Sequence, residues 1–187
     1  MGYTTEFKGK LQFSKPLSAE QVAYVNLFSH TRRMKRDPEK LAKIYGGKSG
    51  LLGTDNYGFE GEYFAHDDGN YGQVEDDSII EYNIPPGQKL FNRGNETFDQ
   101  YWDENQRRIK EGECVPGLWC GWEISNDGIF LQWDGGEKFY NYVEWLQWMI
   151  KHFFEPWGYE LNGKIKWQGE NRRDKGTIAV AKNIVTI

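Results

Sequence analysis

Cysteine and histidine are scarce in this sequence, which weakens any prediction of a metal site. Cys114 and Cys120 are separated by five residues in ECVPGLWC, a spacing that fits neither CxxC nor a four-ligand zinc site. We expect two reduced thiols and no bound metal. The chain has three histidines, so a site built on His66, Asp67 and Asp68 would lack the further histidines that a metal hydrolase needs.

Long apolar runs and a basic excess are also missing. No run of 18 or more apolar residues occurs, and MGYTTEFKGK has no apolar h-region, so we expect neither membrane spanning nor secretion but a cytoplasmic protein. The formal net charge is −5, which argues against non-specific binding of a nucleic-acid backbone, because that requires a basic face. A local basic cluster can still bind a small anion.

Recognisable catalytic and nucleotide-binding motifs are absent. The sequence contains no GxSxG, GxxxxGK[ST] or GxGxxG. Carboxylate pairs such as Asp134 with Glu137, or Glu144 with Glu170, could act as acid and base only if the fold places them at the required separation. The sequence therefore favours a non-enzymatic protein without a cofactor and leaves a nucleotide or glycan hydrolase as an alternative.

Aromatic residues are in excess. Phe, Trp and Tyr make up 16% of the chain, and seven of its eight tryptophans lie between Trp119 and Trp167. Such residues are enriched in cores and binding surfaces alike, because they combine a large contact area with one polar atom in Trp and Tyr. The 187 residues contain no evident linker, so we expect a single globular domain over residues 1–187.

Alternation and turn signals predict an α+β fold with a mainly antiparallel, twisted sheet. Residues 3–13 alternate between apolar and polar side chains, which indicates a strand with one wet face. Asn-Asp-Gly at 126–128 and Asn-Gly at 162–163 lie between apolar runs, and each predicts a hairpin. The stretch TIAVAKNIVTI supplies further strands. Tight turns between strands favour antiparallel pairing.

Capping motifs indicate where the helices begin. Ser18 and Gln21 have the spacing of a capping box and start a long N-terminal helix, which we expect over residues 18–36. A short helix follows from Pro38, because proline is favoured at the first helical position. The capping-box spacing recurs at the start of residues 97–110, which predicts a polar helix there.

A central aromatic-rich helix is expected from about Glu137 onward, packed on the sheet. At 100° per residue its side chains form one apolar stripe for the core: Phe139, Tyr142, Val143, Leu146, Met149, Ile150 and Phe153. Trp148 falls roughly opposite this stripe, and Trp145 and Tyr140 fall on its flanks. Either another part of the chain covers Trp145 and Trp148, or both form an exposed interface for a partner protein.

Two segments carry candidate ligand-binding residues. TRRMKRD contains Arg32, Arg33, Lys35 and Arg36, which either complement the dipole at a helix end or form an anion site. WDGGEKFY joins a strand to a helix through glycines, so its N–H groups can approach a ligand, and Asp134 there fits a turn residue better than a catalytic acid. The candidate ligand-binding residues are Arg32, Arg33, Arg36, Trp119, Trp122, Trp133, Asp134, Lys138, Tyr140 and Trp167.

Seven segments together resemble a widespread family of uncharacterised proteins from bacteria and their phages. They span nearly the whole chain: GYTTEF, TRRMKRD, YNIPPGQ, PGLWCGW, WDGGEKFYNYVEWLQWMIKHF, PWGYELNGKIKWQGE and DKGTIAVAKNIV. Members of that family run from PPGQ directly into PGLWC, so we expect residues 89–115 to form a peripheral helical insert. Lys182 stands where the family usually has an acidic residue.

The resemblance implies a small accessory protein of the cytoplasm, or of the host cytoplasm if a phage encodes it. By analogy with accessory proteins that counter host defence signalling, we expect non-enzymatic sequestration of a small anionic, nucleotide-like ligand between aromatic rings and arginines. One alternative is an inhibitor or adaptor that binds a host protein through exposed Trp145, Trp148 and acidic loops. The nucleotide or glycan hydrolase is the other alternative.

Overall fold

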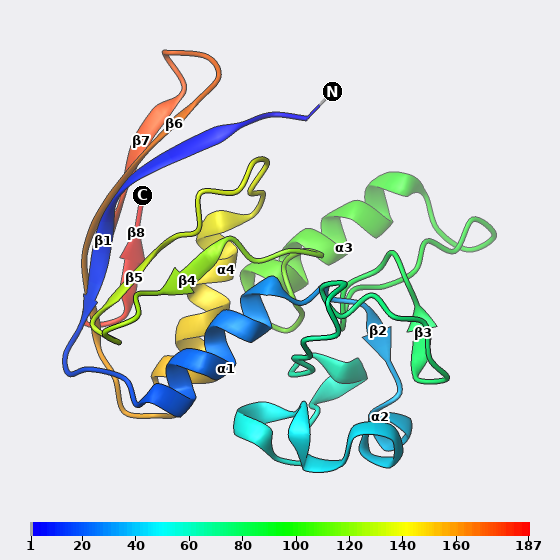
Figure 1. The fold of residues 1–187 in the computed structure, drawn as a ribbon. Coiled ribbons are helices and arrows are strands. Elements are labelled where there is room, and N and C mark those ends of the chain that lie inside the picture. Colours follow the sequence, from blue (N-terminus) through cyan, green and yellow to red (C-terminus); the bar gives the residue numbers. More distant parts are fainter. Residues whose placement is uncertain (1) are drawn as a thin grey trace. The chain divides into compact units, whose positions relative to one another are not determined.

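The structure, a computed structural model, describes residues 2–187 and divides into two compact units (Figure 1). Unit 1 comprises the residues up to Ser29 together with Cys120–Ile187, and unit 2 comprises His30–Trp119. The fold is α+β with a mainly antiparallel sheet, as the sequence predicts. Each unit is described separately below.

Unit 1 is built on a six-stranded antiparallel sheet with the order β4-β5-β1-β6-β7-β8. Its strands are β1 Thr5–Phe13, β4 Trp122–Ile124, β5 Phe130–Trp133, β6 Leu161–Gly169, β7 Lys175–Ala181 and β8 Ile184–Thr186. The two central strands, β1 and β6, pair over nine residues, from Thr5 opposite Gly169 to Phe13 opposite Leu161.

The predicted alternation in β1 is confirmed. Phe7, Leu11 and Phe13 are buried, whereas Lys8 and Lys10 are exposed on the other face. Strand β6 repeats this pattern with buried Leu161 and Ile165 and exposed Lys164 and Lys166. Helices α1 and α4 cover the apolar face of the sheet (Figure 1). The polar side chains of the central strands therefore form the outer face of unit 1.

One predicted hairpin is confirmed and the other is wrong. The turn at 126–128 joins β4 to β5, with Gly128 at a positive φ of 73°. Asn162 and Gly163 instead lie inside β6, because β1 pairs with this strand along its whole length. Gly163, with φ 140°, allows close approach of the neighbouring strand, since a Cβ there would lie 2.9 Å from the carbonyl oxygen of Lys10.

The long N-terminal helix is not confirmed, because α1 spans only Ala19–His30. Its predicted capping box is present, with Ser18 Oγ accepting from Gln21 N and Gln21 Oε1 accepting from Ser18 N. After His30 the backbone N–H groups find partners outside a helix: Arg32 N donates to Tyr71 O and Arg33 N to Leu118 O. Bonds to distant segments therefore replace the predicted helix over residues 31–36.

The aromatic helix starts later than predicted. Helix α4 spans Tyr142–Met149 and continues as a π-helical turn over Ile150–Phe154. Lys138 and Asn141 have positive φ angles of 60° and 53°, so the chain between the glycine turn and α4 is irregular. The predicted core stripe is confirmed, since six members are buried and Tyr142 is half-buried.

Unit 2 is rich in loops, as its glycine and aspartate content predicts. Its regular elements are β2 Lys35–Arg36, α2 Pro38–Tyr45, β3 Ile79–Glu81, α3 Phe98–Lys110 and three short 3₁₀ turns at Gly46–Lys48, Leu51–Gly53 and Phe59–Gly61. Leu41, Tyr57 and Phe64 form an apolar cluster. Asp37 caps α2 by accepting from two backbone N–H groups, and the predicted capping box of α3 is present.

The segment 89–115 begins and ends at neighbouring points. Val115 N donates to Pro86 O at 3.1 Å, and Gln88 Nε2 donates to Val115 O at 2.8 Å. This arrangement is the one that an insert into an existing loop requires. Helix α3, of 13 residues, forms the middle of the segment.

Both cysteines are free thiols, and both are buried. Burial raises the pKa of Cys114 to about 11, so its thiol stays protonated at neutral pH. In the part of the chain that the structure describes, no helix has the length and apolar character needed to cross a membrane.

Candidate functional site

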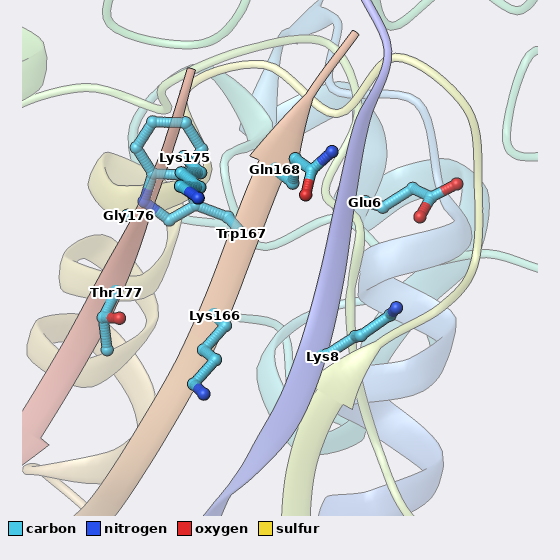
Figure 2. Close-up of a pocket in the computed structure, with 8 residues that line it drawn as sticks. All are labelled: Glu6, Lys8, Lys166, Trp167, Gln168, Lys175, Gly176 and Thr177. Atoms are coloured by element: carbon cyan, nitrogen blue, oxygen red, sulfur yellow. The ribbon is translucent and has the colours of Figure 1, made fainter. Parts of the chain in front are cut away.

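A groove of about 480 Å³ opens on the outer face of unit 1, over strands β1, β6 and β7 (Figure 2). It is lined by Glu6, Lys8, Lys166, Trp167, Gln168, Lys175, Gly176 and Thr177. Polar side chains from three neighbouring strands surround this groove because alternate residues of a strand share one face. Its volume lies within the range of about 300–1,000 Å³ that is typical of small-molecule sites.

The strand register places lysines directly opposite each other. Lys8 of β1 is paired with Lys166 of β6, and Lys10 is paired with Lys164. Within residues 2–187, none of these four side chains forms an ion pair. Like charges directly opposite each other in a sheet are destabilising, so this arrangement costs stability unless an anion lies over it.

Trp167 reaches the groove from the apolar side of the sheet. Its cross-strand partner is Gly176, and a Cβ on that glycine would lie 2.8 Å from the indole ring. The glycine therefore gives the ring room against β7. The ring also packs 5.9 Å from Tyr142, so Trp167 links the core of unit 1 to the groove.

A second cavity, of about 230 Å³, adjoins the groove and shares Glu6 and Gln168 with it. Its lining includes Arg172 and Glu170 from the turn between β6 and β7. Glu170 Oε1 accepts a hydrogen bond of 2.8 Å from Thr4 N, and Asp174 accepts one from the Tyr3 hydroxyl, which raises the pKa of Tyr3. These two carboxylates therefore fix the segment that leads into β1.

Two of the tryptophans predicted to bind a ligand, Trp122 and Trp133, pack against the core residue Phe7. Trp122 is buried, and its Nε1 donates to Tyr142 O at 2.9 Å. Phe7 contacts both Trp122 and Trp133, at ring distances of 5.4 and 5.5 Å. Of the tryptophans predicted to bind a ligand, Trp167 alone lines the groove.

The residues predicted at the glycine junction lie at the surface. Asp134 Oδ1 accepts from Gly136 N at 2.7 Å, which confirms its role in the turn. Tyr140 is 52% exposed, and its hydroxyl accepts from Tyr3 N at 3.1 Å. Lys138 is exposed and lies next to Gly2. None of the three is among the residues that line the groove.

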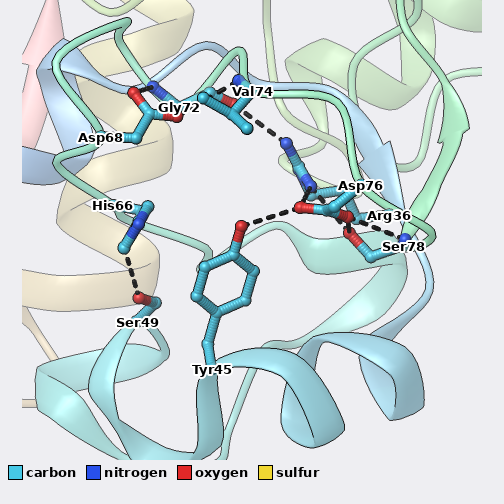
Figure 3. Close-up of polar contacts among 9 residues, drawn as sticks. All are labelled: Arg36, Tyr45, Ser49, His66, Asp68, Gly72, Val74, Asp76 and Ser78. Atoms are coloured by element: carbon cyan, nitrogen blue, oxygen red, sulfur yellow. Dashed lines mark hydrogen bonds and ion pairs between the residues drawn. The ribbon is translucent and has the colours of Figure 1, made fainter.

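Most of the arginine segment is structural. Arg33, Lys35 and Arg36 are buried. Arg36 donates to Asp76 at 2.8 Å, to Ser78 Oγ at 2.7 Å and to a backbone oxygen at 2.9 Å (Figure 3). Because α1 ends at His30, these cations do not complement its dipole as one interpretation of the sequence proposed.

The other two buried cations have partners within unit 2 as well. Arg33 Nε donates to Thr31 O at 2.8 Å, and Lys35 Nζ lies 2.9 Å from a carboxylate oxygen of Glu60. Glu60 in turn accepts from Gly87 N at 2.8 Å. These bonds stabilise loops that contain little regular structure.

Arg32 is the more exposed member of the segment. Its guanidinium lies 4.6 Å from the ring centre of Tyr82 and 5.7 Å from that of Trp119, and one nitrogen donates to Asn83 Oδ1 at 3.1 Å. Trp119 is 41% exposed, and Tyr71 beside it is 63% exposed. Cation–π contacts within the chain thus engage the residues that we expected to stack a ligand.

The prediction of an exposed interface at Trp145 and Trp148 is wrong. Their exposed fractions are 0% and 1%, and Trp148 stacks on Phe28 of α1 at 5.5 Å. The chain itself covers them, which is the first of the two interpretations given above. Exposed aromatic rings occur instead on α3, where Phe98 and Trp102 are 59% and 52% exposed.

The residues considered as metal ligands have other roles. Asp68 accepts hydrogen bonds from the backbone N–H groups of Asn70, Gly72 and Val74, which lower its pKa although burial raises it (Figure 3). His66 Nδ1 lies 3.0 Å from Ser49 Oγ. Within residues 2–187, no group of three or more His, Cys, Asp or Glu residues is arranged to bind a metal ion.

Sequence reasoning missed the opposed lysines on the outer face of β1 and β6. The segments KGKLQF and KIKWQG each place lysines two residues apart on the wet side of a strand, and this was the available signal. Their significance depends on the pairing of β1 with β6, across about 150 residues of sequence. Comparison with family models, with curated proteins and with solved structures finds no match to this chain.

Proposed function

We propose that this protein binds a phosphate-bearing, nucleotide-like anion in the groove on the outer face of unit 1. The observation that carries the proposal is the pair of directly opposed lysines that line the groove, Lys8 and Lys166. Each lysine keeps a positive charge for which the described chain provides no ion-pair partner. An anion that bridges the strands would turn this repulsion into attraction.

Protection of a sheet edge does not account for the lysines of β6. Lysine often blocks the exposed edge of a sheet against pairing with another chain. Strand β6, however, pairs with β1 on one side and with β7 on the other at both Lys164 and Lys166, whereas β1 pairs with β5 only at Leu11 and Gln12. A role in solubility alone would not require two lysine pairs in direct register.

Charge segregation strengthens the proposal. The chain as a whole carries a formal net charge of −5, yet the outward positions of β1, β6 and β7 have one acid, Glu6, beside five lysines: Lys8, Lys10, Lys164, Lys166 and Lys175. A basic face on an acidic protein concentrates a positive potential and guides anions toward that face. Gln168 and Thr177 add neutral hydrogen-bonding groups beside the charges.

The hydrolase alternative is less well supported, because the carboxylates considered for hydrolysis have other roles. Asp134 accepts a backbone hydrogen bond within its own turn, and Glu170 does so from Thr4. Both carboxylates therefore stabilise the local structure. A ligand bound in the groove would dissociate without being hydrolysed. Sequestration that counters host defence remains a prediction that depends on the family resemblance.

Reversing the charge of one lysine of an opposed pair should raise the stability of the fold and lower the affinity for a groove ligand. In Lys8→Glu, the new carboxylate faces Lys166, so we expect the free energy of unfolding to rise by about 0.2–1 kcal/mol. Affinity for a groove ligand should fall about tenfold or more, since a hydrogen bond to a charged group contributes about 1.5–3 kcal/mol. Calorimetric titration with ATP, ADP-ribose and a cyclic dinucleotide measures binding, and urea unfolding measures stability.

The matched control is Lys43→Glu, the same charge reversal at an exposed position of α2. It should leave affinity unchanged. Failure of the unaltered, folded protein to bind any of the three ligands would count against the proposal, as would an equal loss of affinity in both variants. A large loss of stability in Lys8→Glu would show that the lysine pair stabilises the fold.

A second candidate function, binding of a partner protein, rests on α3. Phe98 and Trp102 stack at 6.3 Å and are both more than half exposed, and exposed Asp99 and Asp103 flank them on the same helix. This surface suits a partner with an apolar patch rimmed by basic residues. It replaces the buried Trp145 and Trp148 as the basis of the adaptor alternative.

Replacing both aromatic residues tests this candidate. Phe98→Ser with Trp102→Ser should abolish binding of a protein captured from host lysate, once that protein is purified and its affinity is measured directly. Asp99→Lys with Asp103→Lys should weaken the same interaction, because the partner is expected to be basic. Unchanged affinity in both double variants would refute the role of α3.

A further inference from the structure

The polar outer face of the β1–β6 pair continues beyond the groove at both ends. At one end lies the cavity beside Arg172, which shares Glu6 and Gln168 with the groove. At the other end lies a third cavity of about 430 Å³, lined by Gln12, Phe13, Ser14, Asn162 and Gly163. Lys10 and Lys164 lie on the same two strands, between the groove and this third cavity.

The outward residues of paired β1 and β6 form what we call the β1–β6 track. This track is longer than one nucleotide. Nine residues of β1 pair with β6, and at about 3.4 Å per residue they extend about 30 Å. Each strand carries two outward lysines, and their positive charges are about 7 Å apart. Two such pairs side by side suit a ligand that carries several negative charges in line.

We propose that the natural ligand is a linear polyanion, a single-stranded oligonucleotide, that lies along the β1–β6 track. This inference rests on the proposed function and specifies its ligand class. Repeated phosphates would lie over Lys8, Lys166, Lys10 and Lys164 in turn. The negative net charge of the chain argues against binding of a nucleic-acid backbone. That charge, however, includes acidic residues elsewhere in the chain that do not lie on this face.

The track offers few rings for stacking bases. Phe130 of β5 lies under Lys10, with the ammonium 4.9 Å from the ring centre, and Trp167 lines the groove. The backbone of the ligand therefore supplies most of the contacts. Binding should depend strongly on salt and weakly on base sequence, as in proteins that bind single strands through a charged groove.

Length dependence distinguishes this inference from binding of a mononucleotide. Fluorescence anisotropy with labelled oligothymidylates of three, six and twelve nucleotides, alongside a labelled mononucleotide, should show affinity rising with length. Log affinity against log salt for the longest strand should have a slope of about −2 to −3.5, because each phosphate neutralised on a single strand contributes about −0.7. A mixed-sequence strand of twelve nucleotides should bind within about threefold of the oligothymidylate.

Two lysines outside the groove provide the decisive variant. The double variant Lys10→Gln with Lys164→Gln should lower the affinity for the twelve-nucleotide strand roughly fivefold or more. It should leave the affinity for the mononucleotide unchanged, because neither residue lines the groove. Lys40→Gln with Lys43→Gln, on exposed positions of α2, is the matched control and should change neither.

Each contrary outcome has a defined meaning. Equal affinity for the mononucleotide and all strand lengths would overturn the oligonucleotide inference and leave the proposed function standing. No binding of any probe by the folded protein would overturn both. Binding of heparin but of no oligonucleotide would overturn nucleic acid as the ligand, and an equal loss in the α2 control would show that the track is not the site.

Discussion

Replacing Trp148 with alanine is expected to lower the free energy of unfolding by about 3–5 kcal/mol, the usual cost of removing a buried Trp or Phe side chain. Trp148 is 1% exposed. Its ring stacks on Phe28 at 5.5 Å, meets Phe153 edge-on at 5.3 Å and lies 4.2 Å from the ring of His152. Alanine would leave a cavity where helices α1 and α4 meet.

Urea unfolding followed by circular dichroism measures this loss. Trp148→Phe keeps a ring in the same place and should cost less than alanine. Trp102→Ala removes a tryptophan that is 52% exposed, so its effect should stay within about 0.5 kcal/mol. A loss below 1 kcal/mol in Trp148→Ala would contradict the core assignment and restore Trp148 as a candidate contact for a partner.

Arg36→Met should destabilise unit 2 by about 3–5 kcal/mol, because it removes one member of a buried ion pair. The Arg36 side chain is 1% exposed and that of Asp76 is 14% exposed. Without the guanidinium, the carboxylate keeps its bonds from Ser78 and from the Tyr45 hydroxyl, 2.7 Å away, but loses its counter-charge. Gly72 O would also lose its donor.

The partner variant shows whether charge or packing causes this loss. Arg36→Met combined with Asp76→Asn leaves no unpaired carboxylate, so the double variant should regain part of the lost stability. Arg107→Met removes an exposed arginine that pairs with Glu111, so the free energy of unfolding should change little. Equal losses in Arg36→Met and Arg107→Met would refute the structural role given to the buried pair.

The same pair predicts sensitivity to acid. Burial raises the pKa of Asp76, but hydrogen bonds from Ser78 and Tyr45 and the charge of Arg36 outweigh it, so the pKa lies below its ordinary value of 3.8. A carboxyl whose pKa is lower in the folded state stabilises the fold fully above its ordinary pKa. This stability should decline as the pH falls below about 4 and through the folded-state pKa. Arg36→Met should show a weaker decline.

Local patterns identified most elements correctly because short-range contacts specify them. The capping boxes at Ser18 and Thr97 depend on side chains three residues apart, and the alternation of residues 3–13 follows from strand geometry alone. The apolar stripe of α4 follows from helical period. The α+β class could therefore be predicted from the sequence, whereas the single-domain organisation stays a prediction.

Errors arose where distant partners compete with local preference. Asn162 and Gly163 have the composition of a hairpin turn, but β1 extends the ladder through them. Residues 31–36 continue a helical pattern, but their N–H groups and cationic side chains bond to the loops of unit 2. Buried partners of this kind cannot be seen in a sequence, since they depend on how far-separated segments fold together.

The sequence by itself determined the two halves of the basic face, because alternation exposes Lys8 and Lys10 on one strand and predicts exposure of Lys164 and Lys166 on another. Only the tertiary structure decided that these lysines face each other in register on the two central strands. It also decided that Trp145 and Trp148 are core, since α1 packs over the side of α4 that the helical period alone would expose to solvent. Strand pairing and helix packing are long-range choices, fixed by the burial of apolar surface across the whole of unit 1.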